Sequence, residues 1–527
     1  MLMLNRRLLL ALLGCGALLT ASGLLQLLVD SDLGVGWPHN VIRNWSQFGL
    51  GELQGHLVIN PGGQEALAQP DVYSGHRAAS LYPAFWISRL FAWTGSYMLP
   101  FHLLLNMVVM VSIWKLLGQT SEGFFIGALL ILCPGYVLWP TILDPNAMAA
   151  LAGIPFAALV WRRLRQEHLS AGDLFFLVVL TLLFSALNWT VALVHAPLFF
   201  CLLATRKVSW QRLALYAGAG ALAGVAVVVV GLTSKLSDAG NHSGGFGQLL
   251  AGYTWGSGGY ANGSNTPTLL LRLAFINIVA LLPLWLVWAW KWSSLVRSEP
   301  VRAAWSLLPL GVAVLEPVAM RNYFCHHPWM AAPFLLVGGI LSLFVILSPA
   351  ATPAAMPSAA ASPRRKLAWS LAVVTTFCFG FVILLTYREQ GAQLNSLIAL
   401  VRAHTPRSEI LAVPRSVDPQ TAAEVKRLDE LLDRRLIVVD RVPDPQHPAP
   451  AGFVLSGVAL EGAWSPIARS TPDPLQSVPL LRGALNWFNQ RVSRRKSGDR
   501  LDLPETFFLY QVPTAMTSAS SPAFHEP

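Results

Sequence analysis

The feature that most constrains this chain is a series of apolar runs, each about as long as a helix that crosses a lipid bilayer. Such a helix needs about 20 consecutive apolar residues. Hydrophobic residues make up 54% of the 527 positions and charged residues 12%, which is not the composition of a water-soluble globular protein. The sequence therefore predicts an all-α polytopic membrane protein. About eleven spans are expected, at 8–29, 96–117, 121–140, 145–163, 172–188, 190–206, 211–232, 268–291, 302–319, 328–348 and 367–387.

The distribution of basic residues predicts the orientation of these spans. Arg6 and Arg7 precede the first span, and about 15 of the 21 lysines and arginines before residue 388 fall in connections on that same side. The positive-inside rule assigns this side to the cytoplasm. The amino terminus is then cytoplasmic and the carboxyl terminus extracytoplasmic, with a bacterial inner (plasma) membrane as the expected location. The first run is long for a signal peptide and no small-residue cleavage site precedes Asp30, so we interpret it as an uncleaved anchor.

One connection leaves the number of spans open, and two long loops separate neighbouring spans. Residues 188–190 are interpreted as a tight outer turn, with one long tilted helix as the alternative. Residues 30–95 and 233–267 are long outer loops, and the stretch 38–48 in the first of them is amphipathic, which suits a helix at a membrane interface.

The composition turns soluble after residue 387. From there on the chain holds roughly 16 basic and 15 acidic residues, so almost all of the net charge of +10 lies in the membrane part. No basic stripe interleaved with aromatics suggests nucleic acid. Periodicity predicts one helix and several strands in this region. The expected organisation is a transmembrane domain (1–387), an extracytoplasmic α/β domain (388–513) and a disordered tail (514–527). The predicted helix is 396–404, and the predicted strands are 409–413, 436–440 and 506–512.

Aspartates at membrane mouths are the first candidates for chemistry. Asp30 and Asp32 follow the first span, and Asp144 precedes the fourth, all on the predicted outer side. A carboxylate there costs free energy unless it is hydrated or paired, so such a residue marks a candidate functional site. Local structure offers an alternative, because Asp144 before Pro145 is also a helix N-cap with proline at the first position, and Asp30 or Asp32 could cap an interfacial helix.

Further polar residues on the predicted outer side are candidates for substrate binding. The first loop carries one pair four residues apart on a helix and a second pair downstream, and the connection between the ninth and tenth spans adds three more. These residues are His39, Arg43, His76, Arg77, Arg321, His326 and His327. For the last two histidines, a place at the interface beside aromatic residues is the alternative.

Taken together, these motifs resemble the GT-C superfamily of membrane glycosyltransferases, which includes the protein O-mannosyltransferases and the bacterial aminoarabinose and lipid A glycosyl transferases. The resemblance runs through roughly the first 210 residues: an acidic motif early in a long first outer loop, an aspartate at the start of the fourth span, and an outer soluble domain after the last. Two departures are evident. The usual Asp-Glu is Asp30-Ser31-Asp32, which leaves open which aspartate is the base, and the usual His-Pro-Pro is His76-Arg77-Ala78.

The resemblance implies inverting transfer of a sugar from a polyprenyl-phosphate donor in the bilayer to a lipid, glycan or protein acceptor. Asp32 would take the acceptor proton. Asp144 would orient the acceptor, hold the donor or share a divalent cation, for which Mg²⁺ or Mn²⁺ suits the carboxylate oxygens of Asp30, Asp32 and Asp144. The donor phosphate would meet cationic side chains. Those expected are Arg321, His326 and His327, assisted by Arg77 or Arg272.

Other function classes remain as alternatives at this stage. A flippase or transporter of a lipid-linked saccharide would show internal repeats and discontinuous helices. The sequence has no repeat between its halves, and its charged residues lie at the mouth of the membrane. A glycan polymerase or ligase usually relies on arginine-rich outer loops, which are sparse here. A non-catalytic assembly subunit with a degenerate transferase fold is the last alternative.

Overall fold

The computed structural model describes residues 6–29, 37–63, 66–72, 78–91, 98–166, 168–187, 192–237, 274, 277–319, 331–348, 363–390, 392–462, 464–470, 504 and 506–513. The chain divides into two compact units. Unit 1 comprises residues 1–27 and 74–382, and unit 2 comprises residues 28–73 and 383–527. The predicted division differs, because it placed the whole first loop with the membrane domain, whereas residues 28–73 group with the carboxyl-terminal segment.

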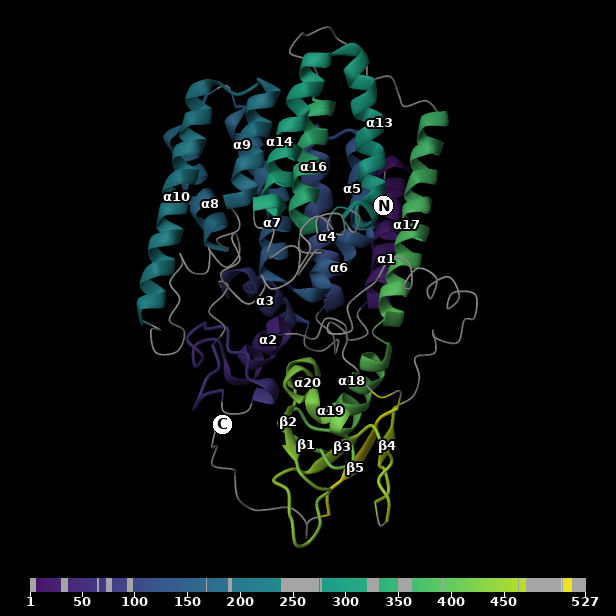
Figure 1. The fold of residues 1–527 in the computed structure, drawn as a ribbon. Helices are drawn as coiled ribbons and strands as arrows, with labels where there is room; N and C mark the ends of the chain where they lie inside the picture. Colours follow the sequence, from purple (N-terminus) through teal and green to yellow (C-terminus); the bar gives the residue numbers. More distant parts are fainter. Residues whose placement is uncertain are drawn as a thin grey trace, which may run out of the picture. The chain divides into compact units, whose positions relative to one another are not determined.

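Unit 1 is built of helices, which Figure 1 shows running side by side. Most of them lie within a few residues of a predicted span, because the same apolar runs that predict a span also favour a helix. The helices are α1 (Arg6–Val29), α3 (Tyr82–Leu90), α4 (Met98–Leu116), α5 (Ser121–Ile131), α6 (Pro134–Ile142), α7 (Pro145–Leu164), α8 (Ala171–Leu187), α9 (Ala192–Thr205), α10 (Trp210–Ser237), α13 (Leu282–Ser298), α14 (Pro300–Ala319), α16 (Ala332–Leu347) and α17 (Pro363–Gln390), with η2 (Ala78–Ser80) before α3.

Three helices in the described part of the chain are long and apolar enough to cross a membrane: Met98–Leu116, Pro145–Leu164 and Leu367–Leu385. A bent pair of helices passes the same test when its members are taken together. These helices agree with the class of membrane protein that the sequence predicts. The count of eleven spans and the orientation stay predictions. The shorter apolar helices are Gly14–Leu28, Ala171–Leu187, Val194–Thr205, Pro300–Leu315 and Ala332–Leu347.

The segment predicted as one span at 121–140 is a broken helix. Ser121–Ile131 and Pro134–Pro140 meet at an angle of 64°. Cys133 adopts an extended conformation (φ −71°, ψ 130°), and Pro134 opens α6. Proline lacks the N–H that would continue the first helix, and it disfavours helical geometry in the residue before it. An average of hydropathy over the whole run does not show this break.

Close helix packing in unit 1 depends on a glycine. Gly338 of α16 faces α14, and an added Cβ there would lie 2.4 Å from Cβ of Ala313 and 3.2 Å from the carbonyl oxygen of Pro309. Real Cβ atoms do not approach so closely, so any larger residue would push the two helices apart. Small residues at such contacts are typical of helices that associate in membranes.

Unit 2 contains a five-stranded sheet in the order β2-β1-β3-β5-β4. β1 is parallel to both β2 and β3, and β5 is antiparallel to both β3 and β4. The small α/β sheet predicted after residue 387 is therefore present, and all three predicted strands overlap observed ones. The strands are β1 (Ile410–Pro414), β2 (Arg435–Val439), β3 (Phe453–Ser456), β4 (Ala468–Arg469) and β5 (Phe508–Gln511), and the helices of this segment are α18 (Ala392–His404), α19 (Pro419–Ala423) and α20 (Val425–Leu432).

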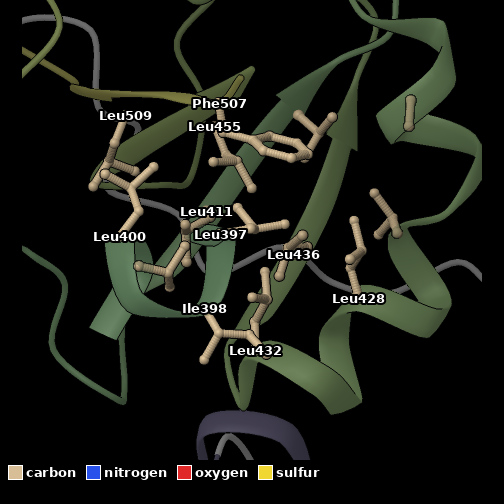
Figure 2. Packing of buried hydrophobic residues seen from close by; sticks show 14 residues of the cluster. Leu397, Ile398, Leu400, Leu411, Leu428, Leu432, Leu436, Leu455, Phe507 and Leu509 are labelled. Atoms are coloured by element: carbon tan, nitrogen blue, oxygen red, sulfur yellow. The ribbon is translucent and has the colours of Figure 1, made fainter. Parts of the chain in front are cut away.

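Both faces of this sheet are covered. Successive side chains of a strand point to opposite faces, so Leu411 joins the core beneath α18 and α20 while Ala412 joins the core on the other face. Figure 2 shows the first core, where Leu397, Leu428 and Phe507 meet the sheet. The members of both cores belong to residues 392–512, so this segment supplies its own hydrophobic interior.

The first-loop part of unit 2 is held by side-chain amides and one indole. It begins with α2 (Trp37–Phe48), which includes the predicted amphipathic stretch, and it contains η1 (Pro61–Gly63). Asn44 donates hydrogen bonds to the carbonyl oxygens of Val58 (2.8 Å) and Asn60 (3.1 Å), and Trp45 Nε1 donates to His56 O (2.8 Å). These bonds satisfy backbone acceptors in a segment with little regular structure.

Candidate functional site

Three of the predicted site residues fall in the described part of the chain: Asp144, His39 and Arg43. The first belongs to unit 1 and the other two to unit 2. Seven lie outside the described residues, and their roles stay predictions. Those seven are Asp30, Asp32, His76, Arg77, Arg321, His326 and His327.

Asp144 occupies the junction between α6 and α7. Leu143 ends α6 in the left-handed conformation (φ 53°, ψ 26°), and this turn starts the chain in a new direction. Asp144 then caps α7, with its Oδ1 accepting a hydrogen bond from the backbone N–H of Ala147 at 2.9 Å and Pro145 at the first helical turn. The interpretation of Asp144 as an N-cap is therefore confirmed. A cap of this kind satisfies a backbone donor at the helix start, and it also fixes the direction of the carboxylate.

The electrostatic environment of Asp144 sets it apart from an ordinary surface cap. Asp144 is only 5% exposed. Burial raises the pKa of this carboxyl to about 6, and the hydrogen bonds from Ala147 and Asn146 oppose that rise. No ion pair to Asp144 is present among the described residues. A carboxyl with a pKa near neutrality can take up and release a proton at working pH, which general acid–base chemistry requires.

A buried polar cluster joins α1 to α4, and sequence reasoning missed it. Asn106 donates to Ser22 Oγ at 2.5 Å, and Ser22 Oγ lies 2.9 Å from Nε2 of His102. All three side chains are fully buried. If the hydroxyl hydrogen of Ser22 points to His102, a neutral His102 carries its ring proton on Nδ1. His102 and Asn106 stand four residues apart in an apolar span, and that spacing could have drawn attention to them.

Two aromatic side chains of α6 add buried polar atoms near this cluster. Tyr136 and Trp139 lie one helical turn apart, and the ring of Tyr136 is 6.5 Å from that of His102 between centroids. The hydroxyl of Tyr136, the indole Nε1 of Trp139 and Nδ1 of His102 have no hydrogen-bond partner in the described structure. A buried polar atom without a partner costs about 1–3 kcal/mol, so such a group in a native protein calls for an explanation.

A second buried histidine links three helices of unit 1. Nε2 of His195 (α9) lies 3.1 Å from Ser185 Oγ (α8), and its Nδ1 lies 2.9 Å from the hydroxyl of Tyr216 (α10). Phe156 and Phe184 pack edge-on against its ring. Both ring nitrogens therefore have partners, which fits a structural hydrogen-bond network better than a reactive group.

His39 and Arg43 lie on α2, as predicted, and the structure gives Arg43 a partner inside unit 2. Arg43 Nη1 donates to Asp433 Oδ2 at 2.9 Å, although the two residues are 390 positions apart. His39 is buried in the same helix. Whether either residue also binds a substrate stays a prediction. No local sequence pattern predicts this ion pair.

Asp433 is the centre of this contact. It ends α20 in the left-handed conformation (φ 51°, ψ 44°), and its carboxylate also accepts bonds from Arg407 Nε (2.7 Å), Arg407 Nη2 (3.1 Å) and Gly62 N (3.0 Å). Burial by itself would raise the pKa of Asp433, but hydrogen bonds from Arg407 and Gly62 and the charges of Arg43 and Arg407 hold it below its usual range. We call Asp433, Arg43, Arg407 and Gly62 the Asp433 clamp.

The described residues do not test whether the predicted metal site exists. They contain no group of three or more His, Cys, Asp or Glu side chains placed to hold a metal ion. The predicted ligand set includes Asp30 and Asp32, which lie outside the described part. The divalent cation therefore remains a hypothesis based on oxygen ligands alone.

The comparisons with known proteins do not extend this description. No protein-family model matches the chain, and no curated protein sequence matches it. The resemblance to GT-C glycosyltransferases therefore stays a prediction from the motifs.

Proposed function

We propose that this chain is an integral-membrane glycosyltransferase of the GT-C type, with about eleven transmembrane helices. It transfers a sugar from a polyprenyl-phosphate donor to a lipid, glycan or protein acceptor at the extracytoplasmic face of the membrane. Most lysines and arginines before residue 388 fall in the connections on one predicted side of the membrane, and this asymmetry supports the orientation.

The observation that carries the proposal is the buried, protonatable carboxyl of Asp144. The resemblance places an acidic residue at the start of the fourth span, and Asp144 stands there, 5% exposed and with its pKa raised by burial to about 6. A purely structural N-cap gains nothing from such burial, because a serine or asparagine caps a helix about as well without a charge. An ionisable residue at a membrane span is costly, and it therefore marks a candidate functional site.

The chemistry follows from the roles that the resemblance assigns. The acceptor oxygen attacks the anomeric carbon, its proton passes to a carboxylate, and the bond between that carbon and the phosphate oxygen breaks. Asp32 is the proposed base, with Asp30 as the alternative. Asp144 orients the acceptor or holds the donor, and the departing phosphate meets Arg321 and the histidines after it.

A transporter or flippase of a lipid-linked saccharide is the second candidate, and one observation favours it. The broken helix of α5 and α6, bent by 64°, is the kind of discontinuous span that many transporters use at their substrate sites. Buried polar side chains lie on this break and beside it, among them Tyr136 and His102. The two functions differ in whether a covalent bond changes, and an experiment can decide between them.

The test of the proposed function has two stages. A mass-spectrometric profile of lipid-linked and surface glycans, taken from a gene-deleted strain with and without the wild-type gene, identifies the missing sugar and its carrier. The purified protein is then incubated in detergent with that carrier and acceptor. Detergent removes the two compartments that transport needs, so formation of product there supports a transferase, and a missing glycan with no product in detergent supports a transporter.

Variants at Asp144 separate the chemical role from the capping role. Asp144→Asn and Asp144→Ser keep a good N-cap and remove the charge, whereas Asp144→Ala removes the cap at a cost of about 1 kcal/mol. We expect all three to lose transfer, with normal membrane abundance for Asn and Ser. Full transfer by the Asn and Ser variants would show that Asp144 only caps α7.

A further inference from the structure

A group of basic side chains lies in unit 1 where several helices begin and end. One residue follows α7, two follow α9, and one each lies in the first turn of α10 and of α14. The helices α9, α14 and α16 pack against one another, and Figure 1 shows the α9–α10 and α13–α14 connections at the same end of the helices. We call these residues the cationic cluster: Arg165, Arg206, Lys207, Arg212 and Arg302.

Two members of the cationic cluster bind the carboxyl ends of helices. Arg212 Nη1 donates to carbonyl oxygens on both sides of Arg165, among them that of Leu164 at 2.7 Å. Arg302 donates to carbonyl oxygens in the last turn of α16 at 2.9, 3.0 and 3.1 Å, and it also pairs with Glu299. A cation at a helix end satisfies free carbonyl groups and the negative end of the helix dipole. These two arginines therefore have structural partners, and Arg212 brings the start of α10 beside Arg165.

The other three members have no anionic partner among the described residues. None of the ion pairs in that part of the chain includes Arg165, Arg206 or Lys207. Burial lowers the pKa of Lys207, and the positive charges of Arg302 and Arg165 lower it further. These like charges are therefore close enough to repel one another, and an anion bound among them would relieve that repulsion.

Arg206 has a backbone conformation that arginine rarely adopts. It is left-handed (φ 53°) directly after α9, a place where glycine is the usual residue. Its guanidinium carbon lies 5.3 Å from the ring centre of Trp305, one helical turn after Arg302 on α14. Trp210, the first residue of α10, is 72% exposed. Tryptophans beside basic side chains are typical of the headgroup region of a bilayer.

The predicted orientation of the chain accounts for the number of these cations but not for their arrangement. The positive-inside rule concerns how many lysines and arginines a connection carries. It does not require that cations from α7, α9 and α14 converge, or that Lys207 be partly buried beside two like charges.

We propose that the cationic cluster binds the phosphate of an anionic lipid, with Arg165, Arg206 and Lys207 as its cationic contacts. Basic sites between transmembrane helices bind anionic headgroups in this way, because the charge of the phosphate is matched while the acyl chains stay in the bilayer. Arg212 and Arg302 contribute by holding the ends of α7 and α16 beside the site. This inference does not depend on the proposed sugar transfer.

The first test measures lipid binding to the full-length protein in detergent micelles, with native mass spectrometry to count the bound lipid molecules. Phosphatidylglycerol carries a net negative charge, whereas phosphatidylcholine carries a phosphate without net charge. We expect phosphatidylglycerol to bind at least about fivefold more tightly, equivalent to about 1 kcal/mol. Equal affinity for the two lipids would overturn the inference.

Matched variants locate the binding in the cationic cluster. Lys207→Gln removes one cation of the cluster, and Lys115→Gln removes the same charge at an exposed lysine in the last turn of α4. We expect phosphatidylglycerol to bind about fivefold more weakly to Lys207→Gln and to Arg206→Asn, in which asparagine suits the left-handed backbone. Lys115→Gln and Lys207→Arg should bind like wild type. An equal loss in Lys115→Gln, or no loss in Lys207→Gln, would contradict the assignment.

Thermal unfolding separates a lipid from a free anion and binding from folding. Without added lipid, Lys207→Gln should unfold at or above the wild-type temperature, because the variant removes charge repulsion. Phosphatidylglycerol should raise the unfolding temperature of wild type more than that of Lys207→Gln, and inorganic phosphate at the same concentration should raise neither. Equal stabilisation by inorganic phosphate would rule out a lipid as the occupant, and an equal lipid-dependent rise in Lys207→Gln would leave Lys207 with a structural role only and overturn the proposal.

Discussion

Asp144 and Asp433 are two buried aspartates at helix ends, and their carboxyl groups titrate in opposite directions. Both accept a backbone N–H, and both are almost fully buried. The pKa of Asp144 is raised by burial, to about 6, whereas the pKa of Asp433 is lowered because the Arg407 and Arg43 charges and their hydrogen bonds outweigh the effect of its burial. Because both carboxyls are buried, the neighbouring cations account for the difference: they lower the pKa of Asp433, whereas burial raises the pKa of Asp144.

The two buried carboxyls therefore have different roles in their units. In unit 2 the charge is matched by guanidinium groups, so the pair holds two segments together and is unavailable for other chemistry. In unit 1 the described residues around Asp144 supply backbone donors and no paired cation. An unpaired carboxyl of this kind is the one that can exchange a proton or receive a cationic partner from a substrate.

The largest expected effect comes from breaking the paired site. Arg407→Ala removes the side-on pair and leaves the buried carboxylate of Asp433 with Arg43 and Gly62 alone. Removing one partner of a buried pair leaves a charge that Arg43 compensates only in part, so we expect unit 2 to lose about 3 kcal/mol of stability. Hydrogen exchange of α20 and of residues 37–63 measures this. The control variant Arg415→Ala, at an exposed arginine of the same domain, should exchange like wild type. An equal loss of stability in that variant would mean that the Asp433 clamp does not stabilise unit 2 more than an exposed arginine does.

An effect of similar size at most should appear as two opposite pH dependences of stability. The folded-state pKa of Asp144 is raised, so its contribution to stability is complete below about pH 3.9 and is lost as the pH rises toward about 6, by up to about 3 kcal/mol. The folded-state pKa of Asp433 is lowered, so its contribution is present above about pH 3.9 and is lost as the pH falls below that value.

Thermal unfolding between pH 3 and pH 7 tests both predicted directions of the change in stability with pH. Wild type should lose stability relative to Asp144→Asn as the pH rises from 4 to 6, and it should lose stability relative to Asp433→Asn as the pH falls below 4. Parallel curves for wild type and Asp144→Asn would mean that this carboxyl is solvated in the folded protein.

The smallest expected effect concerns the polar atoms that have no partner. Tyr136→Phe removes a buried hydroxyl that has no hydrogen-bond acceptor in the described structure, and the aromatic ring stays in place. Because an unsatisfied buried group costs free energy, we expect the variant to be more stable than wild type by about 1 kcal/mol. A clear loss of stability in the thermal unfolding curve would show that a water molecule or a further residue holds this hydroxyl.

Local patterns in the sequence predict local structure well in this chain. Asp144-Pro145 predicts a capped helix start, and the structure has one. Apolar runs predict β1, β2 and β5, whereas β4 was missed because two residues are too few to show a period. β3 was also missed, although it has four residues, as β5 does. The break at Cys133-Pro134 is also local, but the apolar run on both sides hides it from a window of twenty residues.

Contacts between distant residues could not be predicted in the same way. Arg43 was interpreted as a substrate contact because it shares a helix face with His39 in the first outer loop, yet its partner is 390 residues away. Residues 28–73 group with the carboxyl-terminal segment, and the bonds from Arg43 and Gly62 to Asp433 join the two segments without any periodic pattern in the sequence. Of the candidate site, only the position of Asp144 follows from its immediate neighbours.

The separation between Arg43 and Asp433 also has a consequence for synthesis of the protein. A ribosome adds about 5–20 residues per second, so Arg43 is made roughly 20–80 s before its partner exists. During that time α2 and the residues after it have no Asp433 to bind, and the contact can form only once about four fifths of the 527 residues have been translated. A chain that ends before Asp433 therefore cannot form this contact.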